Sequence, residues 1–269
     1  MNRKTIAELM QVDSRTGLFG PEGLMTDRRL TDESAVSFIQ GLVEGLDLPS
    51  SVPEEVRGHF DTLRHLHTYG AFSYDLFGMC ASAADMTIEF VLGVRFVEWH
   101  SGRVPLVEHG TGKQETVPVD DYAQLVPRLG RRRPDGTGGW HLKGDSHFDG
   151  SLASLLRWGR TSGVLSGWLG TIWSQAYRNI LSTELTQSGS RRRIPAEWET
   201  WTSDERTHWI ETSLRPDWEQ EYLDNIRQLR NVTAHRTSHF ITYPPDSART
   251  LRWLAEVITA MWPPADEPG

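Results

Sequence analysis

The stretch that decides the fold is residues 71–99, AFSYDLFGMCASAADMTIEFVLGVRFVEW, the longest apolar stretch in the chain. Few polar residues interrupt it, and its large apolar side chains recur at steps of three and four, which is the repeat of an α-helix. They are Phe72, Leu76, Met79, Ala83, Met86, Phe90 and Val94. The pattern predicts a helix that is buried on most sides and lies at the centre of the core.

Two further features of this stretch bear on function. Asp85 and Glu89 lie four residues apart and so share one helix face, where they could serve acid–base chemistry or orient an arginine. We favour the simpler interpretation that they line an interface or a solvent-facing strip. Cys80 is the only cysteine, which excludes an intramolecular disulfide, fits a reducing compartment and indicates a small buried side chain.

The composition is that of a globular protein that is not secreted. A chain of 269 residues with 38% hydrophobic and 24% charged residues fits one domain with extensions. Its eleven tryptophans are typical of bulky core and interface packing. The first residues contain no signal peptide, and no later stretch approaches the roughly eighteen apolar residues of a membrane span. We therefore expect a soluble, cytoplasmic protein that does not contact a membrane.

The charge balance limits how the protein could bind nucleic acid. A formal net charge of −8 argues against a general nucleic-acid coat protein, whose affinity comes from an overall positive surface. An enzyme that acts on RNA needs only local cations, which residues 131–133 and 191–193, both Arg-Arg-Arg, could supply. We favour the ordinary interpretation of each run as a solvated cluster in a loop.

The first half of the chain contains two further helices and one irregular region. The pattern of residues 32–46 predicts an amphipathic helix, and Ser51 with Glu54 has the form of a capping box that opens the next one. That helix would carry residues 64–67, Arg-His-Leu-His, on a polar surface. In residues 101–150, two extended runs around a Gly-Thr-Gly turn predict a hairpin, followed by a long loop.

Helical patterns return after residue 150. Leucines and tryptophans at helical steps predict two helices with a bend over 151–185, because glycines interrupt the run. Thr202 and Glu205 form a second candidate capping box. We expect Pro216 to interrupt the chain before the next helix.

The next helix is predicted over residues 217–236, and a final helix, capped by Asp246, ends before Pro263. At about 100° per residue, Asn231 and His235 share a stripe opposite the apolar face of the helix over 217–236. That apolar face consists of Trp218, Tyr222, Ile226, Leu229 and Val232. A core histidine would lie within the apolar arc, so we expect His235 to face solvent or a second surface.

Arg230 and His235 together could cleave RNA. The two are five residues apart, about 140° around one helix, but two copies of the helix around a two-fold axis could bring them to one cleft. Histidine suits the proton transfers of phosphodiester cleavage, and an arginine fork matches phosphate geometry. Asn231 could fix the tautomer of His235 or bind ribose or phosphate. This chemistry requires no metal and no cofactor.

The run Leu229-Arg230-Asn231-Val232-Thr233-Ala234-His235 resembles the signature of the HEPN superfamily, an arginine, a polar residue, three further residues and a histidine. Members are all-helical and usually dimeric, and many are metal-independent endoribonucleases of toxin–antitoxin, antiviral defence and CRISPR-related systems. The resemblance implies that Arg230 binds phosphate, His235 is the acid–base residue and Asn231 supports them. Thr237 stands where a related subgroup has a tyrosine that a partner nucleotidyltransferase modifies, which argues against that regulation.

The resemblance covers residues 59–262 and predicts a mainly α fold, a HEPN-like helical bundle with an inserted loop and hairpin region at about 101–150. In this interpretation, residues 84–95 correspond to the early buried helix of the family. Residues 1–58 form an N-terminal extension, and residues 263–269 a frayed tail.

Three hypotheses follow for function. The first is a homodimeric endoribonuclease that acts on single-stranded RNA, the effector of a bacterial antiviral defence or toxin–antitoxin system with an antitoxin or other defence partner. The second is a non-catalytic dimeric module that binds a partner protein, RNA or nucleotide. The third is an accidental motif with His235 buried in a core. His235 and His239 could ligate a metal, but the sequence offers no zincin glutamate and no obvious third ligand.

Overall fold

The structure is a computed structural model that describes residues 5–25, 28–131, 134, 138–182, 197–235 and 242–264, without the side chains of residues 6, 175–182, 199 and 229–235. It is mainly helical, as predicted. The longer helices are α2 (Asp32–Val43), α3 (Glu54–Tyr69), α4 (Asp75–Trp99), α6 (Leu152–Thr161), α7 (Ser166–Ser182), α8 (Ser203–Trp209), α9 (Arg215–His235) and α10 (Pro244–Met261). The short helical segments are α1 (Ile6–Leu9), η1 (Thr16–Leu18), α5 (Tyr122–Leu125), η2 (Val126–Arg128), η3 (Trp198–Thr200) and the π-helical turn η4 (Ile210–Leu214).

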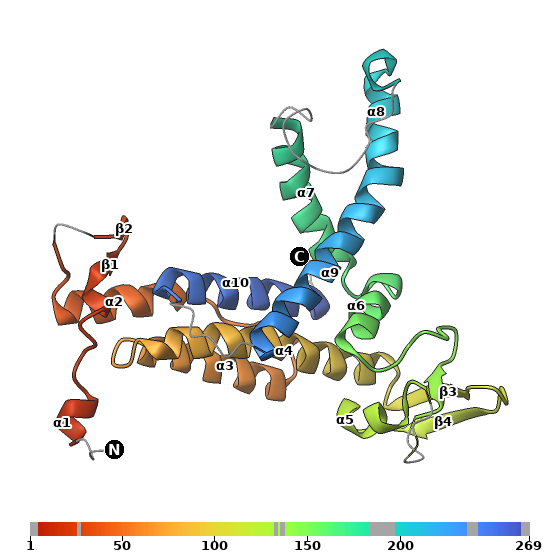
Figure 1. Ribbon diagram of the computed structural model, residues 1–269, viewed down its shortest axis with the longest axis horizontal. Helices are drawn as coiled ribbons and strands as arrows, with labels where there is room; N and C mark the ends of the chain where they lie inside the picture. Colours follow the sequence, from red (N-terminus) through yellow and green to blue (C-terminus); the bar gives the residue numbers. More distant parts are fainter. Residues whose placement is uncertain are drawn as a thin grey trace.

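Four helices form what we call the body, namely α2, α3, α4 and α10. Helix α4 packs against both α3 and α10, and α2 packs against α3 and α10. Figure 1 shows α3, α4 and α10 lying side by side along the long axis of the molecule, with α2 at one end of the body and α9 crossing it. Because α5 (Tyr122–Leu125), α6 and α9 also pack against α4, five of the described helices share this one central element.

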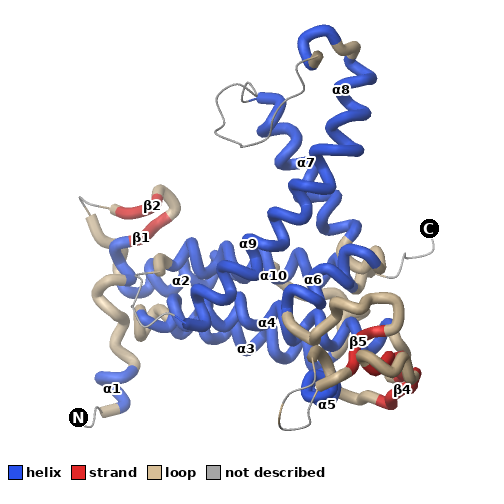
Figure 2. Tube along the Cα trace, turned by 45° about the vertical axis from the view of Figure 1, so that its right-hand side comes forward, coloured by secondary structure: helices blue, strands red, loops and turns tan. Residues whose placement is uncertain are grey.

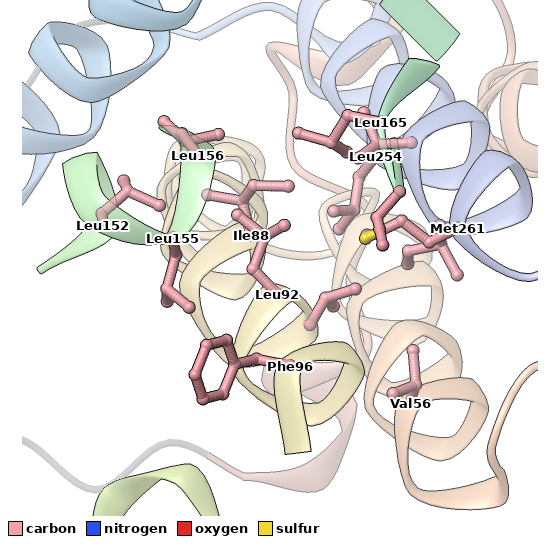
Figure 3. Packing of buried hydrophobic residues seen from close by; sticks show 14 of the residues in the cluster. Val56, Ile88, Leu92, Phe96, Leu152, Leu155, Leu156, Leu165, Leu254 and Met261 are labelled. Carbon is pink, nitrogen blue, oxygen red and sulfur yellow. The ribbon is translucent and has the colours of Figure 1, made fainter. Parts of the chain in front are cut away.

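The core on either side of α4 is aliphatic and closely packed. Figure 3 shows Ile88, Leu92 and Phe96 between leucines of α6 and side chains from α3 and α10. The α6 leucines are Leu152, Leu155 and Leu156, and those from the other side include Val56, Leu254 and Met261. Each fully buried side chain of this size contributes about 1.5–3 kcal/mol through burial, so this cluster is the main source of stability.

The predicted orientation of α4 was wrong, although the helix itself was correct. The buried face carries Phe77, Cys80, Ala84 and Ile88, whereas much of the run that we expected to be buried faces outward. Met79, Met86 and Phe90 are 58%, 47% and 39% exposed. Apolar residues occur around the whole circumference of α4, so their periodicity could not distinguish the two faces. We call Met79, Met86 and Phe90 the α4 outer face.

Helix α4 also corrects an expectation about membranes. Among the described helices, it alone combines enough length with an eighteen-residue window of mean hydropathy 1.4, and so could cross a membrane by composition. The prediction that no stretch approaches a membrane span was therefore wrong. Because α3, α6, α9 and α10 pack around it, we interpret α4 as the core helix of the fold.

Residues 13–24 of the N-terminal segment pack against the body. The short strands β1 (Phe19–Gly20) and β2 (Gly23–Leu24) form a ladder next to α2. Phe19, Ile39 and Phe77 meet in a second small core. Asp13 binds the Arg15 guanidinium at 2.7 Å, and this hydrogen-bonded pair lowers the pKa of Asp13 to about 2.

The start of α3 differs from the prediction. Pro53 is the N-cap and no side chain caps the helix, so the capping box of Ser51 and Glu54 does not form. The Ser51 hydroxyl instead donates to the carbonyl of Trp262, 2.9 Å away, and so ties the start of α3 to the end of α10. A tertiary hydrogen bond has replaced the local one.

The inserted region contains a three-stranded antiparallel sheet in the order β4-β3-β5. The predicted hairpin is confirmed as β3 (Arg103–Glu108) and β4 (Gln114–Pro118), whereas β5 (Trp140–Leu142) lies in the predicted loop. Val104, Leu106 and Leu142 are buried on the inner face of this sheet.

Helices α7, α8 and the first half of α9, with η4 between them, project from the body and form what we call the arm (Figure 1). Figure 2 shows the same projection from a second direction. The two helices expected over 151–185 are confirmed as α6 and α7, and the Thr202–Glu205 capping box forms as predicted.

The expected interruption at Pro216 was wrong. In η4, the Arg215 N–H bonds to the Ile210 carbonyl, five residues back, and Pro216 then occupies the first turn of α9. The wide π turn carries the chain past a residue that has no N–H to donate. At α10 the N-cap is Tyr243, so Asp246 lies within the first turn, where its charge favours the helix dipole.

Candidate functional site

Helix α9 carries the predicted motif in its last turns. Its backbone is helical through residue 235, so Arg230, Asn231 and His235 lie on one continuous helix. Their side chains fall outside the described residues, and the structure assigns no distance between the guanidinium and the imidazole. Thr237, His239 and residues 132–133 and 191–193 also lie outside the described part of the chain.

The described side chains of α9 show which side of the helix rests on the body. Leu223 and Ile226 are buried, and Tyr222 packs against the same core. The predicted apolar face is thus confirmed at Ile226 and extended by Leu223. Position 230 follows these two residues by seven and four positions, which places it on the same side of the α9 axis.

A groove opens where α4, α9 and α10 meet, next to the motif along α9. Its volume is about 320 Å³, within the range of small-molecule sites. It is lined by Asp85, Tyr222, Asn225, Ile226, Arg249, Thr250 and Trp253. We call it the α9 groove. Sequence reasoning missed it because its lining comes from three helices whose packing the pattern of each helix does not specify.

Aromatic side chains form one wall of the α9 groove. The indole N–H of Trp253 donates to the Tyr222 hydroxyl, 3.3 Å away. Trp218 stacks on Tyr222 with ring centroids 5.2 Å apart and ring planes 16° from parallel, and Trp168 contacts both Tyr222 and Trp253. Burial raises the pKa of Tyr222, so its hydroxyl stays protonated at neutral pH. The wall therefore presents ring surface, and the indole N–H of Trp253 is already bonded.

The rim of the α9 groove carries polar groups of both signs. Asn225 and Arg249 are exposed, and Arg249 forms an ion pair with Asp246 at 3.3 Å while staying 77% exposed. Arg252, three residues further along α10, is also exposed. On α4, Asp85 lines the groove beside α9 side chains, which fits our interpretation of that carboxylate as an interface residue.

A second and larger groove lies between α2 and α3. It measures about 560 Å³ and is lined by Ser37, Gln40, Gly41, Val43, Glu44, Asp61, Arg64, His65 and Thr68. The Arg64 guanidinium already binds Asp47 at 2.8 Å and Asp61 at 3.2 Å. Its cation is therefore matched by carboxylates of the same chain.

The expectation that residues 64–67 lie on a polar surface was wrong for His67. This imidazole is fully buried, because α3 turns the side of Phe60, Leu63 and His67 toward the core. Its Nδ1 forms a hydrogen bond with the Ser247 hydroxyl of α10 at 3.1 Å. Desolvation lowers its pKa to about 4, so the ring is neutral at physiological pH.

Within the described ranges, no three His, Cys, Asp or Glu side chains gather in a way that could hold a metal ion. His109 and His141 lie close together, with ring centroids 4.5 Å apart. They occupy diagonal positions on the outer face of the inserted sheet, because His141 pairs with Val107 across the strands.

No protein-family model, curated protein or solved structure matches this chain.

Proposed function

We propose that this protein is a cytoplasmic, metal-independent endoribonuclease of the HEPN type that cleaves single-stranded RNA through Arg230, Asn231 and His235. Its proposed setting is a bacterial antiviral defence or toxin–antitoxin system, with an antitoxin or other defence protein as partner. The observation that carries the proposal is the run Arg-Asn-Val-Thr-Ala-His within one continuous helix of a mainly helical chain.

The proposed reaction is an internal transfer at a phosphodiester. His235 accepts the proton of the 2′-hydroxyl, whose oxygen attacks the adjacent phosphorus, and the bond to the 5′-oxygen breaks. That 5′-oxygen takes up a proton, from the second His235 of the dimer or from water, and leaves as a hydroxyl. Arg230 stabilises the charge on the phosphoryl oxygens. The products are a 2′,3′-cyclic phosphate and a 5′-hydroxyl.

The packing of α9 supports a site on a rigid base. Leu223 and Ile226 fix the helix against the core, two turns and one turn before Arg230 respectively. Catalytic side chains need such support, because small displacements of the reacting groups cost large factors in rate. The motif therefore lies at the end of α9 that rests on the body.

The α4 outer face supports the homodimer that the proposal needs. Met79, Met86 and Phe90 are exposed on a helix that packs directly against α9. Grouped exposed apolar side chains mark interaction surfaces in soluble proteins. A two-fold contact through this face would join two copies of the body that carries α9.

Cleavage of fluorescent single-stranded RNA in the presence of EDTA tests the proposal. Wild-type protein should produce 2′,3′-cyclic phosphate ends, and Arg230→Ala or His235→Ala should lower the rate at least about 100-fold. The matched controls are Arg103→Ala and His65→Ala, which change exposed residues of the same types outside the motif and the α9 groove and should retain cleavage. Equal rates in motif and control variants, or loss of all cleavage with EDTA, would contradict the proposal.

The alternative of a non-catalytic binding module is favoured by one specific observation, the aromatic wall of the α9 groove. Binding sites combine such apolar surface with a few polar groups. Intact RNA after prolonged incubation, together with RNA binding that His235→Ala leaves unchanged, would establish this function instead.

A further inference from the structure

We propose that the α9 groove is a subsite that holds one unstacked base of a single-stranded RNA, with a preference for bases that carry an exocyclic amino group. The inference rests on the proposed function for its biological substrate. The groove itself, however, belongs to the described part of the chain and can be tested without cleavage.

The shape and chemistry of the walls suit a flat heterocycle. Trp253 and Tyr222 offer ring surface, and the hydrogen bond between them occupies the indole N–H, so Trp253 contacts a ligand through its π-face and carbon atoms. The buried side chain of Ile226 closes the groove on the α9 side. Recognition of single-stranded nucleic acid uses bases that are splayed out and stacked on aromatic side chains in this way.

Polar atoms of the groove favour amino-bearing bases. The Thr250 hydroxyl donates its proton to the Asp246 carbonyl at 3.1 Å, so its oxygen is left to accept a hydrogen bond. Asn225 can donate and accept. Adenine, cytosine and guanine each carry an exocyclic amine to donate, whereas uracil presents carbonyl oxygens toward these acceptors.

The α9 groove also lies close enough to the motif for one RNA strand to contact both. Ile226 and Arg230 are one helical turn apart, about 6 Å along the α9 axis, a length that one nucleotide of an extended strand can span. Arg249 at the rim remains exposed although it pairs with Asp246, and can contact a backbone phosphate. A base in the groove would thus place an adjacent phosphate near Arg230.

The groove between α2 and α3 does not suit the same ligand. Its arginine, Arg64, is matched by Asp47 and Asp61, and Glu44 adds a further carboxylate. Its lining residues include no Trp, Tyr or Phe, so this groove lacks the broad ring surface of the α9 groove. Of the two grooves, the one on α9 therefore has the chemistry of a nucleobase site.

Binding of 2′-O-methyl oligonucleotides to the full chain tests the subsite, because methylation removes the attacking hydroxyl and prevents cleavage. Fluorescence anisotropy with adenine, cytosine, uracil and abasic homopolymers of equal length should give tighter binding for adenine and cytosine. Trp253→Leu should weaken adenine binding about ten-fold or more. Trp99→Leu, which removes a 49% exposed indole at the end of α4, is the matched control and should not change it.

A second variant keeps the test valid if Trp253→Leu fails to fold. Asn225 is exposed, so Asn225→Ala should preserve the fold and reduce the preference for adenine over uracil. Oligonucleotide binding that depends on Trp253 or Asn225, in a protein that does not cleave RNA, would support the subsite and reject the nuclease. Equal affinity for abasic and adenine strands, or cleavage and binding unaffected by both variants, would overturn the subsite.

Discussion

The body and the arm differ in how they are held together, although α9 belongs to both. In the body, fully buried aliphatic side chains and phenylalanines surround α4 on several sides (Figure 3). The arm has a small core of its own, formed by Trp173, Ile210 and Leu214 with half-buried tryptophans around them, whereas Trp168 and Leu169 at the start of α7 belong to the main core. The motif-bearing end of α9 is therefore supported by the stronger of the two cores.

The physical reason for the difference is the number of helices that pack around each helix. A projecting pair of helices can bury only one face of each, so its core must come from a few side chains of large area. The arm adds polar links: the Trp173 indole N–H donates to Glu211 at 3.0 Å, and Arg215 binds Glu211 at 3.0 Å and Glu219 at 2.9 Å. These contacts are partly solvated, and each contributes little to the free energy of unfolding.

The largest effect should come from a cavity in the body. Phe96 is fully buried, with ring centroids 4.9 Å from Trp158 and 5.1 Å from Phe148. Phe96→Ala should lower the free energy of unfolding by about 3–5 kcal/mol, measured by urea unfolding followed by circular dichroism. Phe90→Ala on the outer face of the same helix is the control and should cost much less. Similar losses for both variants would show that the two faces of α4 are not as different as the structure indicates.

The next effect concerns pH and the buried imidazole of His67. Its pKa is about 4 in the folded protein and near 6.5 when unfolded, so between these values the unfolded chain binds more protons. Stability is therefore complete above pH 6.5 and is lost as the pH falls toward 4, by about 3 kcal/mol at 1.36 kcal/mol per pKa unit. Unfolding titrations at several pH values measure this slope.

Substitution separates His67 from other acid-sensitive groups. In His67→Asn, an amide can replace the hydrogen bond to Ser247 but does not titrate, so the loss of stability between pH 6.5 and 4 should become smaller. His65→Asn, two residues away and exposed, should retain the wild-type slope. An unchanged slope in His67→Asn would assign the acid sensitivity to another group.

A smaller effect on global stability is expected from the arm. Trp173→Ala removes the largest buried side chain there, but a separately held segment can open without unfolding the rest. Hydrogen exchange should accelerate in residues 203–218, while the amides of residues 88–96 keep their protection. A loss of 3–5 kcal/mol with uniform deprotection would instead show that arm and body unfold as one cooperative unit.

Sequence patterns predicted where the helices lie in the chain better than they predicted how the helices pack against one another. Local signals such as the Thr202–Glu205 capping box and the glycine-interrupted run of α6 and α7 were sufficient because they act within a few residues. The orientation of α4, the burial of His67 and the hydrogen bond of Ser51 to Trp262 depend on contacts between distant segments. The break expected at Pro216 does not occur, because a π-helical turn accommodates the proline. No local sequence pattern predicts such a turn.

The candidate site divides in the same way. The motif Arg230, Asn231 and His235 is a local pattern and could be found in the sequence, together with the helix that carries it. The α9 groove could not, because Asp85, Tyr222 and Trp253 come from three helices and their meeting depends on the packing of α4, α9 and α10. The aromatic wall was visible only as an excess of tryptophan, whose usual role is packing.

The smallest change in stability is expected for a substitution that changes the oligomeric state. Met86 is 47% exposed on the α4 outer face, so Met86→Glu removes almost no intramolecular packing and should alter the unfolding free energy by about 0.5 kcal/mol or less. If that face joins two copies, a buried pair of unpaired carboxylates would prevent association. Light scattering should then show a wild-type dimer, a Met86→Glu monomer and a dimer for the control Leu24→Glu, which changes an exposed residue on β2. A Met86→Glu protein that stays dimeric and active would place the dimer contact elsewhere. A stable monomer that does not cleave RNA would show that the site on α9 needs the α4 outer face.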